Sequence, residues 1–365
     1  MHTRRYFTVF LSLLFAGALS AGQPSRSDQP ARSDQPIGDS IHLNVVVTHK
    51  SEPPVTGLKQ QDFTVLDNNS PRPITSFQAV DGRNSDIHVI ILIDAVNAPY
   101  QAVSYERNQI DKVLRADEGE LTHPTELAAL TDTGLQMLTG FSTDGNALSA
   151  SLSKYTVALR SVLRSAGFYG AAERFQLSLE GLHELMQREA ALPGRKVVLC
   201  LSPGWPLISG PEVELSTKER NQFFADIVDF SNSFGRDNLT LYSIDAWGAN
   251  EPLGREVYWQ NFANGISKPG QVNAGDLALQ VLATKSGGLV LNSNDVAGEI
   301  QHALADARAY YEISFVPAPG ERADQYHQLA VRVAQHGLKA RTRQGYYSGV
   351  TVGRALKVPT PIESR

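Results

Sequence analysis

The sequence has a single cysteine, Cys200, among its 365 residues, so the chain cannot form an internal disulfide. Cys200 lies in the apolar run 197–201, and this position predicts a buried, inert thiol rather than a nucleophile. Without disulfides the fold must rely on its hydrophobic core. With 42% hydrophobic residues, a chain of this length can form a sizeable core and roughly two domains.

The sequence also lacks a strong excess of either charge. Its formal net charge is −5, so we expect neither nucleic acid nor an anionic membrane as partner. At the N-terminus, basic residues precede the apolar stretch 6–19 and small residues follow it. This order predicts a secretory signal peptide over residues 1–21, with an uncleaved anchor as the alternative. We therefore expect an exported protein, periplasmic or secreted, with no membrane span after signal peptide removal.

The motifs of the common enzyme classes are missing too. Segment 183–187 reads H-E-L-M-Q, so Gln187 replaces the second histidine of the zinc-protease helix and His183 alone cannot hold zinc. No G-x-S-x-G or G-x-x-x-x-G-K motif occurs, and the nine histidines include no pair at ligand spacing. We expect a protein that is not an enzyme; an exported hydrolase with an unfamiliar site stays open, because a fold alone does not decide activity.

The chain divides by pattern into five parts. After the signal peptide, residues 22–40 repeat R-S-D-Q-P and predict a disordered linker. Short strands over 41–83 are too few to be stable alone, and further strands are predicted over 309–347, so we expect the two ends to pair into one small β-domain. Residues 86–308 alternate strands with helices, which favours a doubly wound, mostly parallel sheet. Residues 348–365 predict a flexible tail.

One strand organises this α/β pattern. Residues 89–93 are an unbroken run of branched apolar side chains, typical of a central strand that is covered by helices on both faces. The run stops at Asp94, where the carboxyl end of a central strand opens onto the crevice that usually binds ligands. The alternative role for Asp94 is structural, in which its carboxylate accepts N–H groups of the next turn or helix start.

A set of short motifs recurs along the chain in a specific order. They are V-T-G-L at 55–58, D-F-T-V-L-D-N at 62–68, L-I-D at 92–94, G-F-S-T-D at 140–144, Y-S-I-D-A-W-G at 242–248, S-G-G at 286–288, Y-Y-E-I-S-F-V-P at 310–317 and R-T-R-Q-G-Y-Y at 341–347. In this order they resemble the von Willebrand factor type A domain, and more closely the exported von Willebrand factor A-related proteins common in Acidobacteria. The resemblance covers about residues 41–347. It implies a Rossmann-like α/β domain with an interaction role and no established chemistry.

The resemblance also implies a degenerate metal-ion-dependent adhesion site. The family pattern Asp-x-Ser-x-Ser begins here at Asp94, but Val96 and Ala98 replace both serines. The second loop aligns near Ser165 without its threonine, and Gly204 lies near the position of the later aspartate. We therefore expect no cofactor and no bound metal, with weak candidates for Mg²⁺ ligands at Asp94, Asn97 and Asp245.

The same crevice is our candidate site for an unknown protein partner, because its residues follow the carboxyl ends of predicted strands. The candidates are Asp94, Asn97, Tyr100, Ser202, Trp205, Asp245 and Trp247. Packing of the aromatic side chains within their loops is the alternative. Two other functions stay open: a metal-dependent adhesin that uses Asp94 with unorthodox ligands, and the hydrolase. A basic stripe at Lys339, Arg341 and Arg343 favours the solvated face of a strand over a binding patch.

Overall fold

The computed structural model describes residues 40–50, 53–155, 168–206, 215–246, 258–318 and 324–349. The predicted signal peptide, nearly all of the linker and nearly all of the tail lie outside these residues. Residues Gly38–Arg365 group into one compact unit, so the boundary between an α/β domain and a β-domain stays a prediction.

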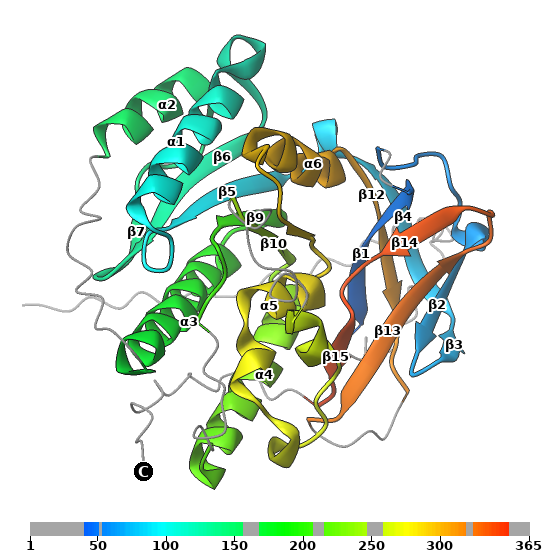
Figure 1. Cartoon of the computed structure of the whole chain (residues 1–365). Helices are drawn as coiled ribbons and strands as arrows, with labels where there is room; N and C mark the ends of the chain where they lie inside the picture. Colours follow the sequence, from blue (N-terminus) through cyan, green and yellow to red (C-terminus); the bar gives the residue numbers. More distant parts are fainter. Residues whose placement is uncertain are drawn as a thin grey trace, which may run out of the picture. The chain divides into compact units, whose positions relative to one another are not determined.

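The main sheet has seven strands, of which six run in the order β11-β10-β9-β5-β6-β7 (Figure 1). Strand β5 pairs in parallel with both of its neighbours, and β9, β10 and β11 continue the parallel part. Only β7 and β8 pair antiparallel, both with β6. The strands are β5 (Ile87–Asp94), β6 (Glu120–Thr131), β7 (Gly134–Met137), β8 (Ser142–Asp144), β9 (Arg195–Leu201), β10 (Leu239–Ile244) and β11 (Val290–Leu291). The predicted mixed α/β fold with a mostly parallel sheet is confirmed, with β5 in the interior.

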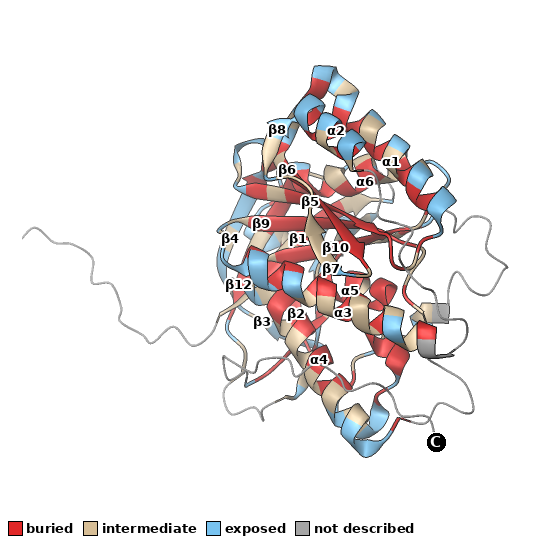
Figure 2. Ribbon diagram, turned by 90° about the vertical axis from the view of Figure 1, so that its left-hand side faces the viewer, coloured by how far each residue is buried: buried red, intermediate tan, exposed pale blue. Residues whose placement is uncertain are grey.

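Helices cover both faces of this sheet, which explains the unbroken apolar run 89–93 within β5 (Figure 2). On one face Val89, Ile91 and Ile93 pack with α1 (Tyr100–Arg115), α2 (Gly145–Lys154) and α6 (Val296–Arg308). On the other face Ile90 and Leu92 pack with α3 (Phe168–Ala190), α4 (Thr217–Arg236) and α5 (Leu279–Ser286). Because successive side chains of a strand point to opposite faces, one unbroken apolar run supplies both cores.

Two further sheets of four strands combine segments from both ends of the chain. One has the order β14-β1-β12-β4 and the other β15-β13-β2-β3. Their strands are β1 (Ile41–His49), β2 (Phe63–Asp67), β3 (Ser70–Arg72), β4 (Ile74–Asp81), β12 (Ala309–Phe315), β13 (Tyr326–Val333), β14 (Leu338–Arg341) and β15 (Gly345–Tyr347). Their inward side chains form a third core that includes Val45, Phe63 and Tyr311. The predicted pairing of early and late strands is therefore present.

Short 3-10 helices connect these elements. They are η1 (Gln60–Asp62), η2 (Gly82–Asn84), η3 (Ala116–Gly119), η5 (Tyr258–Phe262), η6 (Pro269–Gln271) and η7 (Ala274–Leu277). Within the described residues, no helix combines the length and the apolar character that crossing a bilayer requires.

The structure corrects the expectation of a basic stripe on a solvated face. Arg343 is buried, and the Arg341 guanidinium bonds the Asp306 carboxylate and the Gly287 carbonyl oxygen. The Tyr242 hydroxyl donates to the same Asp306 carboxylate at 2.7 Å. These side chains thus attach the C-terminal segment to α6 and β10. Strand periodicity alone could not show this, because the covering element comes from another part of the chain.

Candidate functional site

Asp94 is the last residue of β5, and the chain turns directly after it. The Ala95 N–H still pairs with the Leu130 carbonyl of β6 at 2.9 Å, and α1 begins at Tyr100. Pro99 precedes the helix and supplies no side-chain cap. The turn between strand and helix therefore depends on the Asp94 carboxylate, whose residue is 0% exposed.

Four donors surround this carboxylate. The backbone N–H groups of Val96 and Asn97 each donate to Oδ1 at 3.0 Å, while the Asn97 side-chain amide and the Ser202 hydroxyl donate to Oδ2 at 2.8 and 2.6 Å. Burial raises the pKa of Asp94, and these hydrogen bonds oppose that effect by favouring the charged form. Asp94 thus has the structural role that its position at a strand end allowed: its carboxylate accepts backbone N–H groups at the turn before α1.

The two positions that replace the serines of the adhesion pattern are buried and apolar. Val96 is 0% exposed and Ala98 is 2% exposed, and they pack into the cores on opposite faces of the sheet. Neither has a side-chain oxygen for Mg²⁺, and both oxygens of Asp94 already accept internal hydrogen bonds. These residues do not fit the near-octahedral oxygen shell that Mg²⁺ requires. Across the part of the chain that the structure describes, no group of three His, Cys, Asp or Glu residues could hold a metal ion.

The other members of the predicted crevice have different environments. Asn97 and Ser202 lie against Asp94, and the Asn97 amide also donates to the Ser178 hydroxyl at 2.8 Å. Tyr100 is 58% exposed, as expected for a binding residue. Trp205 is 4% exposed and packs into the core with side chains of α4 and α5, so it follows the packing alternative and does not line a crevice.

Asp245 and Trp247 are the last two residues predicted to line the crevice. Asp245 follows β10, and its N–H donates to the Leu291 carbonyl of β11 at 2.8 Å, so it lies at the same edge of the sheet. Its side chain is half-buried. Trp247 and Ser165 lie outside the described residues. Gly204 adopts a φ of +92°, and a side chain there would collide with the Gln280 amide, which accounts for a glycine at this position.

Sequence reasoning missed Glu106 of α1. This residue is 1% exposed, and its Oε2 atom has no hydrogen-bond partner among the described residues. Burial, followed by the negative charges of Asp94 and Asp245, raises the pKa of Glu106 to about 8. A signal existed: Glu106 falls at helical spacing between Val103 and Ile110 on an otherwise apolar stripe.

The sequence also singled out two other reactive side chains, those of Cys200 and His183. Cys200 is buried as predicted, and burial raises the pKa of its thiol, which disfavours the nucleophilic thiolate. His183 is half-buried and lies 2.6 Å from the Gln187 amide nitrogen and 3.9 Å from Asp229. Burial lowers the pKa of His183, which favours the neutral imidazole.

Fold and site together define an α/β protein whose interior strand ends in a buried, fully hydrogen-bonded aspartate. No protein-family model matches the chain, and no curated protein matches it. Solved structures do share part of the fold. The chain is similar to the human COPII-coat protein Sec24c (8% identity, 72% of this chain and 43% of that chain, TM-score 0.33) and to the SpRpn10 VWA domain (12%, 59% and 93%, 0.26).

A third similar structure is the manganese-loaded TRAP protein of Plasmodium vivax, with 10% identity over 74% of this chain and 96% of that chain and a TM-score of 0.31. The chain spans less than half of the length of Sec24c. These TM-scores are too low to assign the chain to a family. The relation to exported proteins of Acidobacteria stays a prediction.

Proposed function

We propose that this chain is an exported, non-catalytic protein-interaction module of the von Willebrand factor A type, with a degenerate adhesion site that engages its partner without a metal ion. In this proposal the strands of both chain ends form a β-domain beside the α/β domain. The observation that carries the proposal is the hydrogen bonding of Asp94, whose two oxygens accept four internal donors.

The energetics of that carboxylate support a metal-free site. A cation at Asp94 would displace the Ser202 hydroxyl or the Asn97 amide, and each lost hydrogen bond to a charged group costs about 1.5–3 kcal/mol. Val96 and Ala98 offer no oxygen that would compensate. Mg²⁺ loses its water ligands reluctantly, so a site with this deficit competes poorly with solvent.

The proposed partner surface centres on Tyr100. It is one of two large hydrophobic residues that are strongly exposed in the described part of the chain, and it begins α1 directly beside the Asp94 turn. An exposed tyrosine presents a rigid apolar ring with a polar tip, which is typical of residues that dominate binding energy at interfaces. Asp245 at the same edge of the sheet would add a polar rim.

The test is photo-crosslinking in the native cell envelope. A photoreactive amino acid replaces Tyr100 in one variant and Val316, the other exposed hydrophobic residue, in the matched control. We expect position 100 to crosslink one defined protein, equally with and without EDTA, and position 316 not to do so. A crosslink that EDTA abolishes contradicts the metal-free proposal, and equal crosslinking from both positions contradicts the assigned surface.

A metal-dependent adhesin is the second candidate, favoured by two buried oxygens. Asn97 Oδ1 and Glu106 Oε2 are buried without a partner among the described residues, and each is an oxygen of the kind that a hard cation binds. Calorimetric titration with Mn²⁺ separates the two candidates. Stoichiometric binding that Asp94→Asn and Glu106→Gln both abolish supports the adhesin, whereas absence of binding supports the metal-free module.

A further inference from the structure

A shallow cavity of about 510 Å³, widely open to solvent, lies at the edge of the sheet β15-β13-β2-β3, away from the Asp94 turn. Its volume falls in the range of small-molecule sites, about 300–1,000 Å³. Side chains from η1, from β2 and β3 and from the start of β4 line it: Gln60, Gln61, Phe63, Thr64, Arg72 and Ile74. Gln60, Gln61 and Thr64 are exposed, so a solute can reach the cavity directly.

Arg72 is the one charged side chain among the lining residues. Its Nε and one η nitrogen each lie 3.1 Å from Asp67 Oδ2. The second η nitrogen carries two N–H groups that have no partner among the described residues. The Arg72 side chain is 24% exposed, whereas Asp67 is 0% exposed. The cation therefore faces the cavity and its counter-ion lies behind it.

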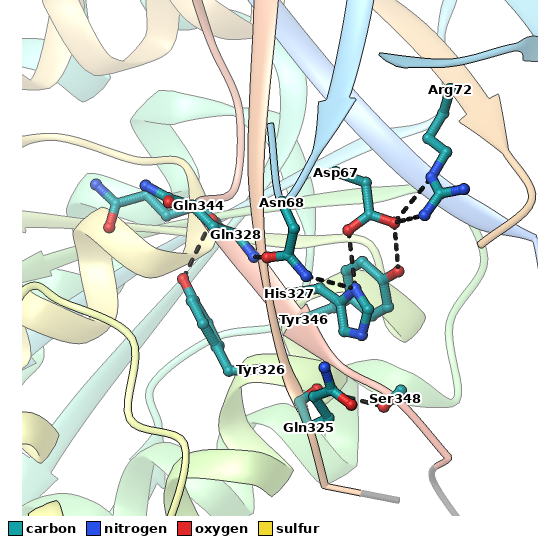
Figure 3. Close-up of polar contacts among 10 residues, drawn as sticks. All are labelled: Asp67, Asn68, Arg72, Gln325, Tyr326, His327, Gln328, Gln344, Tyr346 and Ser348. Carbon is teal, nitrogen blue, oxygen red and sulfur yellow. Dashed lines mark hydrogen bonds and ion pairs between the residues drawn. The ribbon is translucent and has the colours of Figure 1, made fainter. Parts of the chain in front are cut away.

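A network of buried side chains holds this guanidinium in place. Figure 3 shows the Asp67 carboxylate between Arg72 on one side and His327 and Tyr346 on the other. His327 Nδ1 lies 2.8 Å from Asp67 Oδ1, and the Tyr346 hydroxyl donates to Oδ2 at 3.3 Å. The imidazole and phenol rings stack at 4.7 Å between centroids. An arginine that is fixed in this way loses little side-chain freedom when a ligand binds.

The strand edge beside the cavity does not suit a peptide. Pro71 lies within β3 and Pro73 follows it, and neither supplies the N–H group that an added strand would need. A small solute is therefore the better occupant of the cavity.

The lining also defines the chemistry of that solute. One guanidinium that is partly neutralised by Asp67 suits a monoanionic carboxylate better than a phosphate dianion. The amides of Gln60 and Gln61 and the Thr64 hydroxyl can each donate and accept, as ligand hydroxyl groups require. Ile74 and the exposed edge of Phe63 supply a small apolar wall. Phe63 itself is a core residue, 6% exposed, and its ring packs on Tyr311 at 4.9 Å between centroids. We propose that this cavity binds a uronate, a sugar acid whose carboxylate lies on Arg72 and whose ring lies against Ile74 and the exposed edge of Phe63.

Calorimetric titration of the full chain with galacturonate tests the proposal, with neutral galactose and inorganic phosphate as comparison probes. We expect saturable binding of galacturonate, no binding of galactose and weaker binding of phosphate. Arg72→Gln should weaken galacturonate binding at least about tenfold. Arg83→Gln, an exposed arginine outside the cavity, should leave it unchanged.

Gln61 and Thr64 line the cavity but make no contact with the Asp67 network. The variants Gln61→Ala and Thr64→Val therefore test ligand binding even if Arg72→Gln fails to fold. Each should weaken galacturonate binding severalfold. The proposal is overturned by absence of saturable binding at millimolar galacturonate, or by unchanged binding in the Gln61 and Thr64 variants. Equal affinity for phosphate and galacturonate reveals a general anion site and overturns the assigned ligand class.

Discussion

The Ser202 hydroxyl donates a hydrogen bond of 2.6 Å to Asp94 Oδ2, and this bond joins the carboxyl ends of two neighbouring strands, β9 and β5. Ser202 also accepts the Gly204 N–H at 3.1 Å. The loops after both strands are thus fixed to one buried carboxylate. At this edge of the sheet the Asp94 carboxylate fixes loop geometry through its hydrogen bonds.

Replacing Ser202 with alanine should destabilise the protein by about 1–3 kcal/mol. The substitution removes a buried hydrogen-bond donor and leaves Asp94 Oδ2 with the Asn97 amide as its remaining side-chain donor. Urea unfolding monitored by circular dichroism measures the change. Ser76→Ala, on the exposed face of β4, is the matched control and should have almost no effect. Equal stability of the Ser202 variant and wild type would show that water replaces the hydroxyl without cost.

Glu106→Gln should change how stability depends on pH. The pKa of Glu106 is about 8 in the folded protein against 4.5 for an unperturbed glutamate, so the folded state holds a proton that the unfolded state releases between these values. This group makes wild type lose stability as pH rises from about 5 to 8, by up to about 1.4 kcal/mol per pH unit. The side chain of Glu106→Gln does not titrate, so the variant does not lose stability in this way.

Unfolding curves of Glu106→Gln and wild type at several pH values measure that difference. We expect the stability advantage of the variant to grow as the pH rises from about 5 towards 8. Glu120→Gln, at an exposed position of β6, provides the control. An advantage that stays constant over this interval would mean that Glu106 is already ionised in the folded protein.

Asp67→Ala should be among the most damaging single changes in the chain, at about 3–5 kcal/mol, because it leaves the partly buried Arg72 without its counter-ion. His327 loses its 2.8 Å contact as well. Thermal unfolding measures the effect. Asp81→Ala, at an exposed N-cap, should cost much less, and similar costs for both variants would remove the special role of the Asp67 network.

Gly82→Ala should destabilise the junction between β4 and β5. A methyl group on Gly82 would lie 1.7 Å from the Ala307 carbonyl oxygen of α6, so backbone must move to admit it. We expect a loss of at least about 2 kcal/mol. Gly140→Ala, where a methyl group meets nothing within 4 Å, should be neutral in the same denaturation assay. A neutral Gly82→Ala would mean that α6 shifts freely relative to β4.

Part of the site could be predicted because it depends on local pattern. The apolar run before Asp94 placed this carboxylate at the end of an interior strand, and Asn97 is close enough in sequence to reach it. For Trp205 the sequence left crevice and core packing open, and the structure places it in the core. The choice depends on α4 and α5, which come from later parts of the chain. The sequence analysis did not identify Glu106, because its raised pKa depends on burial and on the charges of Asp94 and Asp245. The fold brings those charges near it, and the helical pattern alone does not show them.

The Asp67 cluster shows the same limit more strongly. In the sequence, Asp67 precedes Asn68, Asn69 and Ser70, a pattern that indicates a turn. His327 has no other histidine at ligand spacing. Strand pairing between β2 and β13 brings them together across 260 positions of sequence. Nothing in local composition specifies that contact.

The sequence by itself determined the alternation of strands and helices, the interior position of β5 and the loss of oxygen ligands at Val96 and Ala98, because these depend on side-chain periodicity and identity. The tertiary structure alone decided which polar groups became buried together. The contacts of Ser202 with Asp94, of Arg341 with Asp306 and of His327 with Asp67 all require segments that are distant in the chain to meet. The free energy of burying a charge depends on every neighbour that such a fold brings to it.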